Sequence, residues 1–200
     1  MLAEMIMDAK TNETVLRDAS FENEEIVDLD ASKLEFEQVR FIKCRFAASS
    51  FKRVNLMNVR FENCDLSNCS FTGSYWKNTE IINCKAAGSD FTQAYMKDVR
   101  IEGCSLHYAN CVKTTWMNCT ITDCDFKEAF MSEVKLKGIK LNRVNLTHVD
   151  FFKTPLKGVD LSDCTIDGIM LSDTYTELRG VKMNMFQAAE LARLLGVQVV

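Results

Sequence analysis

Cysteine is the residue type in this 200-residue chain that most suggests a chemical role, because thiolates bind metals and carry redox reactions. Nine cysteines occur, but no two of them form a C-x-x-C pair of the kind found in zinc sites. We therefore expect free, buried thiols that pack as small apolar side chains, with no metal and no cofactor. Eight of the nine are separated by multiples of five residues: Cys44, Cys64, Cys69, Cys84, Cys104, Cys119, Cys124 and Cys164, with Cys111 as the exception.

Other catalytic signals are scarce. The sequence contains no G-x-S-x-G, no P-loop, no G-x-G-x-x-G and no H-E-x-x-H motif. The two histidines, His107 and His148, are expected to be polar surface residues. We predict that the protein is not an enzyme.

A set of lysines and tyrosines suggests binding instead of catalysis. The lysines recur at multiples of twenty residues, and two tyrosines share that spacing. A basic stripe with aromatic residues is typical of a surface that binds nucleic acid or another protein. Long lysine side chains also cover ordinary solvated surfaces, so both interpretations stay open. The candidate binding face consists of Lys77, Lys97, Lys137, Lys157, Tyr75 and Tyr95.

The apolar residues that must position these side chains repeat every five residues. From Phe41 to Leu171, 27 consecutive positions at this spacing are apolar, and only Ala86 and Cys111 among them are small. Two residues before each of them stands a small or β-branched residue. A period of five fits neither the 3.6 residues of a helix turn nor the alternation of a strand.

The chain must therefore turn a corner every five residues. The large and the small residue of each unit lie two apart, so both point inward from an extended segment, while the remaining residues face water. Four such sides close a square coil of twenty residues, and stacked coils satisfy one another's backbone groups. Residues 41 to 171 would then form a rod roughly 30 Å long, at about 4.8 Å per layer.

The repeat resembles that of the pentapeptide repeat proteins, whose unit reads small residue, Asp or Asn, Leu or Phe, and two variable residues. This resemblance implies an all-β fold, a right-handed quadrilateral β-helix with a C-terminal capping helix. We assign residues 1–15 to an N-terminal cap segment, 16–173 to the β-helix and 174–200 to a C-terminal module. The units that fit best are CDLSN (64–68), SDFTQ (89–93), CDFKE (124–128) and VDLSD (159–163).

The C-terminal module should contain one helix. Asn184 can cap it with Gln187 three residues later, and Gly196 ends it. The segment resembles the C-terminal module of quinolone-resistance pentapeptide proteins, which pair end to end. We expect a homodimer through this end, the alternative being a cap that only seals the core. The expected interface comprises Phe186, Leu191, Leu194, Leu195, Val197 and Val199.

The charge distribution bears on function, because some relatives bind DNA gyrase or topoisomerase IV by imitating the negative charge of duplex DNA. Residues 1–39 hold 3 basic and 11 acidic side chains, whereas residues 40–173 hold 18 and 15. The acidity is thus concentrated at the N-terminal end, and the rod itself is not a uniformly anionic imitation of DNA, so the C-terminal resemblance and not the charge supports a topoisomerase partner. We expect a binding protein that interacts with a type II topoisomerase and confers quinolone protection. The alternative is a scaffold that binds another protein or nucleic acid through its lysines. With no export signal and no membrane span, a cytoplasmic location is expected.

Overall fold

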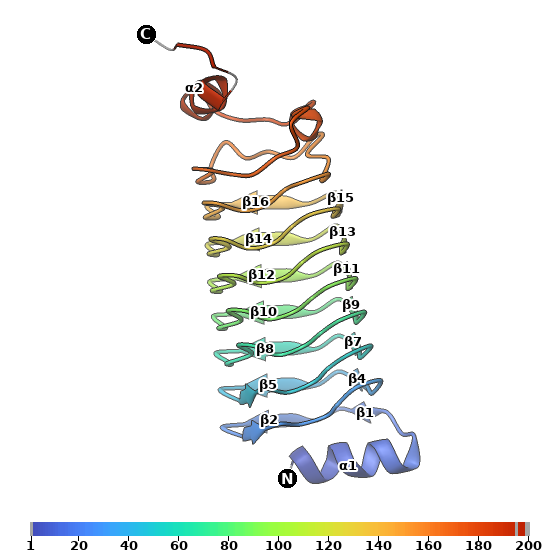
Figure 1. Ribbon diagram of the computed structural model, residues 1–200. Coiled ribbons are helices and arrows are strands. Elements are labelled where there is room, and N and C mark those ends of the chain that lie inside the picture. Colours follow the sequence, from blue (N-terminus) through green and yellow to red (C-terminus); the bar gives the residue numbers. More distant parts are fainter. Residues whose placement is uncertain (1, 195, 199–200) are drawn as a thin grey trace.

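The computed structural model describes residues 2–194 and 196–198, which form a rod of stacked four-sided coils (Figure 1). The expected right-handed quadrilateral β-helix is confirmed. Two faces of the rod are parallel seven-stranded sheets. The first sheet contains β1 (Leu16–Arg17), β4 (Glu35–Glu37), β7 (Asn55–Met57), β9 (Tyr75–Lys77), β11 (Tyr95–Lys97), β13 (Thr115–Met117) and β15 (Lys135–Lys137). The second contains β2 (Ser20–Glu22), β5 (Arg40–Ile42), β8 (Arg60–Glu62), β10 (Glu80–Ile82), β12 (Arg100–Glu102), β14 (Thr120–Thr122) and β16 (Lys140–Asn142).

On the other two faces most of the pairing between coils consists of isolated β-bridges, and only one pair of strands forms. On the third face β3 (Glu25–Val27) pairs with β6 (Arg45–Ala47), and bridges continue from Asp65 to Thr165. On the fourth face bridges run from Asp30 to Met170. Paired residues on the four faces lie twenty positions apart, as the period predicts, except in the last coil, where Asp160 pairs with Lys182.

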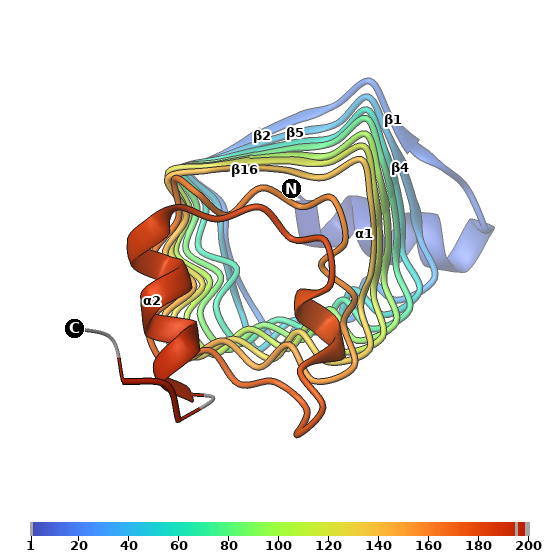
Figure 2. The same cartoon turned by 90° about the horizontal axis from the view of Figure 1, so that it is seen from above.

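Corners form where one residue in five adopts a left-handed backbone. Asn58 and Asn78, for example, have φ values of 54° and 50°. Asparagine tolerates this conformation better than most residues, and Gly73 adopts it (φ 65°) without a Cβ penalty. Seen from the end, the coils are accordingly four-sided, and their corners lie nearly above one another along most of the rod (Figure 2).

The core is a column of side chains that stack between coils. The rings of Phe51, Phe71 and Phe91 lie 5.0 and 5.2 Å apart, centroid to centroid, and nearly parallel. Where the large inward residue is tryptophan, the small residue before it accepts its hydrogen bond: the indole N–H of Trp76 donates to the Ser74 hydroxyl at 2.6 Å. Burial and hydrogen bonding therefore explain why the two inward positions have the residue types they have.

Both ends of the column are covered. Helix α1 (Leu2–Asn12) lies across the first coil and buries Leu2, Ile6 and Ala9 (Figure 1). At the other end come a short 3₁₀ helix, η1 (Thr176–Leu178), and α2 (Met185–Leu194). No helix within the described ranges is long and apolar enough to cross a membrane.

Two polar side chains attach the C-terminal segment to the last coil. The carboxylate of Glu177 accepts hydrogen bonds from the Lys153 amide (2.8 Å) and the Ser172 hydroxyl (2.8 Å). The side-chain amide of Gln187 donates to the carbonyls of Leu161 and Cys164, both at 2.7 Å. Backbone groups that a further coil would otherwise pair are thereby satisfied.

Candidate interaction surface

The tyrosines of the expected binding face lie together on the first sheet. Strands β9 and β11 pair in register, so Tyr75 lies beside Tyr95 and Lys77 beside Lys97. The tyrosine rings stack with centroids 5.5 Å apart and an interplanar angle of 9°. Aromatic planes flanked by two ammonium groups can contact either a base or an acidic protein surface.

The remaining two lysines are not continuous with this group. Met117 occupies the layer between Lys97 and Lys137, and its sulfur accepts a hydrogen bond from the Tyr95 hydroxyl at 2.5 Å. Lys157 lies in a segment outside the sheet, which ends at β15. The structure therefore brings together Tyr75, Tyr95, Lys77 and Lys97, and it separates Lys137 and Lys157 from them.

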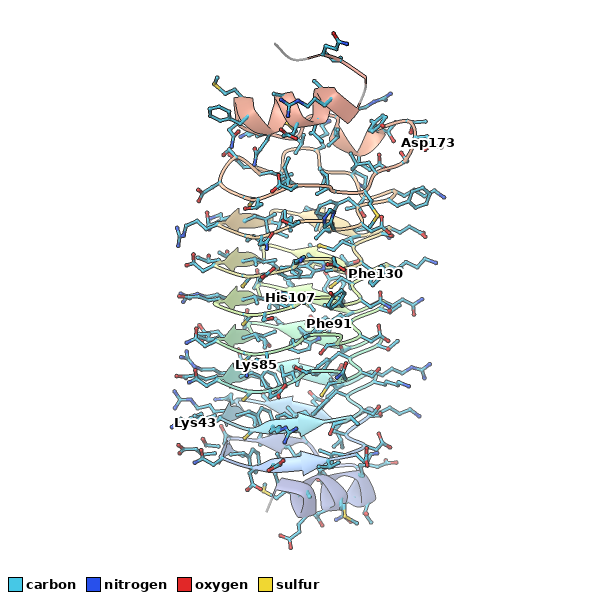
Figure 3. The ribbon with its side chains drawn as sticks, turned by 60° about the vertical axis from the view of Figure 1, so that its left-hand side comes forward. Lys43, Lys85, Phe91, His107, Phe130 and Asp173 are labelled. Atoms are coloured by element: carbon cyan, nitrogen blue, oxygen red, sulfur yellow. The ribbon has the colours of Figure 1, made fainter. Side chains whose placement is uncertain are left out.

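The two histidines occupy separate positions on the third face. Nε2 of His107 lies 2.6 Å from the carboxylate of Asp125, one coil further along. His148 contacts the Gly168 carbonyl through Nδ1 at 3.3 Å. Figure 3 shows His107 on the outside of the rod, one coil from Lys85. Each ring thus has its own partner, and neither forms a base–nucleophile pair with the other.

All nine cysteines are buried and unpaired, which confirms their expected place in the core. The thiol of Cys64, for example, donates to the Phe41 carbonyl at 3.3 Å. Burial raises the pKa of Cys69 and of Cys111 to about 12, so these thiols stay protonated and unreactive. Among the described residues no group of three or more His, Cys, Asp or Glu is placed to hold a metal ion.

Charged side chains on the rod pair between neighbouring coils. Arg45 contacts Glu25 at 2.8 Å, and Arg60 contacts Glu80 at 2.6 Å. Near the N-terminus the Lys10 ammonium lowers the pKa of Asp30. Because opposite charges alternate along the axis, the middle of the rod is not a uniformly anionic surface.

Family comparison agrees with this architecture. The sequence pattern described as "Pentapeptide repeat region" matches residues 14–91 and 34–111, and "Pentapeptide repeats (8 copies)" matches residues 100–138 and 131–168. The chain belongs to the pentapeptide repeat family. No curated protein sequence matches it significantly.

Solved structures show which members of the family share the fold. The plasmid-mediated fluoroquinolone resistance protein QnrB1, in a trypsin-treated variant form, is 23% identical, with 94% of this chain and 100% of that chain covered and a TM-score of 0.58. Full-length QnrB1 is 22% identical, with coverage of 92% and 98% and a TM-score of 0.53. HetL, a pentapeptide repeat protein from the cyanobacterium Nostoc sp. strain PCC 7120 involved in regulating heterocyst differentiation, is 12% identical, with coverage of 88% and 92% and a TM-score of 0.58.

The C-terminal end of this pentapeptide repeat protein has an exposed apolar surface. Phe186 is 75% exposed, and its neighbour Met185 is 76% exposed. Val197 is 52% exposed. Leu191, also part of the expected interface, packs into its own chain and is only 8% exposed. The side chain of Leu194, and residues Leu195 and Val199, lie outside the described part of the structure.

Sequence reasoning missed a second exposed apolar group, on the fourth face. Phe130, Phe152 and Met170 are 41–49% exposed and lie in successive coils, and Figure 3 shows Phe130 on the outer surface. The sequence could have shown this group, because each of the three is a large apolar residue at a position that the period of five does not turn inward, unlike Phe126 and Phe151.

Proposed function

We propose that this pentapeptide repeat protein is a non-enzymatic binding protein whose partner is a type II topoisomerase, DNA gyrase or topoisomerase IV. By binding, it would protect the enzyme against quinolones. The observation that carries the proposal is the correspondence with the fluoroquinolone resistance protein QnrB1 along 94% of this chain and 100% of that one. A rod of matching length and cross-section can present a similarly shaped surface to the same partner.

The N-terminal coils are the part of the rod best suited to contact a DNA-binding enzyme. Eleven of the 28 acidic side chains lie in residues 1–39, against three basic ones. Glu22 and Asp28 project from the first coil and are exposed. Enzyme surfaces that bind DNA are basic because they neutralise phosphates, so an acidic rod end is complementary to them.

Dimerisation through the C-terminal end forms part of this proposal. Met185 and Phe186 leave their side chains about three-quarters exposed, which is costly for a monomer. A two-fold pairing would cover both copies of the patch with the same contacts. It would also place the two acidic ends at opposite tips of a longer rod.

A second candidate function uses the Lys77–Lys97–Tyr75–Tyr95 group. Its stacked rings and paired ammonium groups favour a nucleic acid or an acidic protein surface as partner. This interpretation requires no topoisomerase, and it predicts salt-sensitive binding that depends on the lysines.

Gyrase supercoiling, with and without a quinolone, tests the first proposal. We expect the protein to modulate supercoiling or restore it in the presence of drug at micromolar concentration. The variant Glu22→Lys/Asp28→Lys should lose the effect, whereas the matched variant Lys77→Glu/Lys97→Glu should keep it. No inhibition, no protection and no binding by the parent protein would refute the topoisomerase assignment. Loss of the effect in the lysine variant alone would place the gyrase contact on the lysine face instead of the acidic end.

A further inference from the structure

The β-helix ladder is interrupted at one place, beside the single proline of the chain. In five successive coils the first residue of each strand in the first sheet donates its N–H to the carbonyl 21 residues earlier. Examples are Tyr95 to Ser74 (2.8 Å) and Lys135 to Thr114 (2.9 Å). Pro155 occupies this position in the next coil and has no N–H to donate to Val134. Both sheets end there, with β15 and β16 as edge strands.

The segment above the interruption pairs only with the chain on its other side. Leu156 and Leu161 donate their N–H groups to the carbonyls of Glu177 (2.9 Å) and Lys182 (2.8 Å). In the described structure no backbone hydrogen bond joins residues 134–143 to residues 155–163. On the third and fourth faces the stacking continues unbroken, for example from the Thr165 amide to the Val144 carbonyl (3.0 Å). The last coil therefore loses its backbone pairing with the coil below on the first two faces and keeps it on the other two.

Side-chain exposure also changes at this interruption. Leu136, Ile139 and Leu141 are partly exposed, although their equivalents one coil below, including Trp116 and Ile121, are at most 1% exposed. Figure 2 shows the orange trace of the last coil drawn in from the corner that β15 and β16 form. The result is an apolar step with a narrow, nearly filled recess that has only about 10 Å³ of room for a water-sized sphere and is lined entirely by apolar residues.

Four lysines surround this step. Lys135 and Lys137 project outward from β15, Lys140 projects from β16, and Lys157 lies just above. None of the four forms an ion pair with a described residue, in contrast to Arg143 nearby, which contacts Asp123 at 2.7 Å. The step thus combines an unpaired strand edge, an apolar floor and unneutralised positive charge.

We propose that the β15 edge is a docking site for an extended segment of a partner protein with the pattern acidic–apolar–acidic. In this rod a strand places its outward residues beside the outward residues of its neighbour, as Thr115 and Met117 lie beside Lys135 and Lys137. A peptide strand added to β15 would set its apolar residue on Leu136 and its two flanking carboxylates beside Lys135 and Lys137. Only a peptide strand repeats its N–H and C=O groups at the spacing of this edge, which favours a protein partner over nucleic acid. The inference does not depend on a topoisomerase partner.

A fluorescently labelled peptide of alternating glutamate and isoleucine, Gly-Ser-Glu-Ile-Glu-Ile-Glu-Ser-Gly, tests the site on the full-length protein. We expect saturable binding by fluorescence polarisation. Lys135→Glu/Lys137→Glu should weaken it by about tenfold or more, whereas Lys77→Glu/Lys97→Glu, on the same sheet, should change it by less than about twofold. The β15 variant should in turn bind the lysine-for-glutamate version of the peptide more tightly than the parent does, which also shows that the variant is folded.

Backbone N-methylation of the central residues separates strand pairing from simple charge attraction, and it should abolish binding by the acidic peptide. Absence of binding up to about 1 mM would overturn the proposal, since that is the weak end of specific recognition. Equal loss in both lysine variants, or undiminished binding of the methylated peptide, would also overturn it. Deletion of residues 197–200 should leave the affinity unchanged. A marked rise would instead assign the edge to the tail of a second copy.

Discussion

Phe91→Ala is the substitution that most directly tests the stacked core. Phe91 is 2% exposed and lies on Phe71 with an interplanar angle of 5°. Its neighbour on the other side of the column is the much smaller Cys111. Truncation removes a full ring from a layer whose spacing is held by backbone bonds such as that from the Phe91 amide to the Asn110 carbonyl (2.7 Å). The coils cannot close over the void, so the cavity should persist.

Removing a buried phenylalanine costs about 3–5 kcal/mol, and the lost ring stacking places this site in the upper part of that range. Urea denaturation followed by circular dichroism measures the change as a shift of the midpoint at constant slope. Phe152→Ala is the matched control, because this ring is 41% exposed and its loss should cost less than about 1 kcal/mol. If both substitutions cost the same small amount, the inward register of Phe91 is wrong.

Three further outcomes are expected. A thiol reagent should modify almost none of the nine cysteines in the native protein and all nine after denaturation, and rapid labelling of several native thiols would contradict their burial. Light scattering should give a dimer for the full chain and a monomer for Phe186→Asp or for a chain lacking residues 184–200, and a monomeric parent at tens of micromolar would exclude the end-to-end pair. Burial by itself would raise the pKa of Glu177, but hydrogen bonds from its own backbone, the Ser172 hydroxyl and the Lys153 amide outweigh it and lower the pKa. Ionised Glu177 therefore stabilises the fold above the ordinary value of 4.5, and less so as the pH falls through the folded-state value. Glu177→Gln should accordingly be more destabilising in urea at pH 7 than at pH 4, and an equal effect at both would refute this role.

The repeat register was predictable because it depends on residue types at fixed spacing. Phe41, Phe61 and their equivalents must face inward whatever the rest of the chain does, since no other arrangement buries them all. The helix α1 was not predicted: residues 1–15 were assigned only as a cap segment, because a single short helix without a repeat gives little periodic signal. The capping pair was predicted, but the hydrogen bonds from the Gln187 side-chain amide to the last coil were not. Asn184 and Gln187 bond to each other as the sequence suggested.

Features that depend on pairing between coils were beyond the sequence argument. Leu156 and Leu161 keep the period of five, so the pattern continues through the interruption that Pro155 marks. The gap at Met117 in the lysine stripe can be read from the sequence, but only the structure shows that Lys157 lies outside the first sheet. Leu191 and Phe186 both belong to the apolar residues of the C-terminal helix, and only tertiary packing shows that Leu191 faces the core whereas Phe186 faces solvent.

The register of twenty has a consequence for how such a protein can change in length. Every residue in the middle of the rod has its partners twenty positions before and after it, as Phe61 has Phe41 and Ile81. Removing or duplicating any twenty consecutive residues there restores the same kind of neighbour on each side and keeps all four corners in phase. The distance between the two ends can thus be adjusted in increments of about 4.8 Å without redesigning either cap. An insertion or deletion of five residues, which is one side of the square, would instead rotate one end of the rod by about a quarter turn relative to the other.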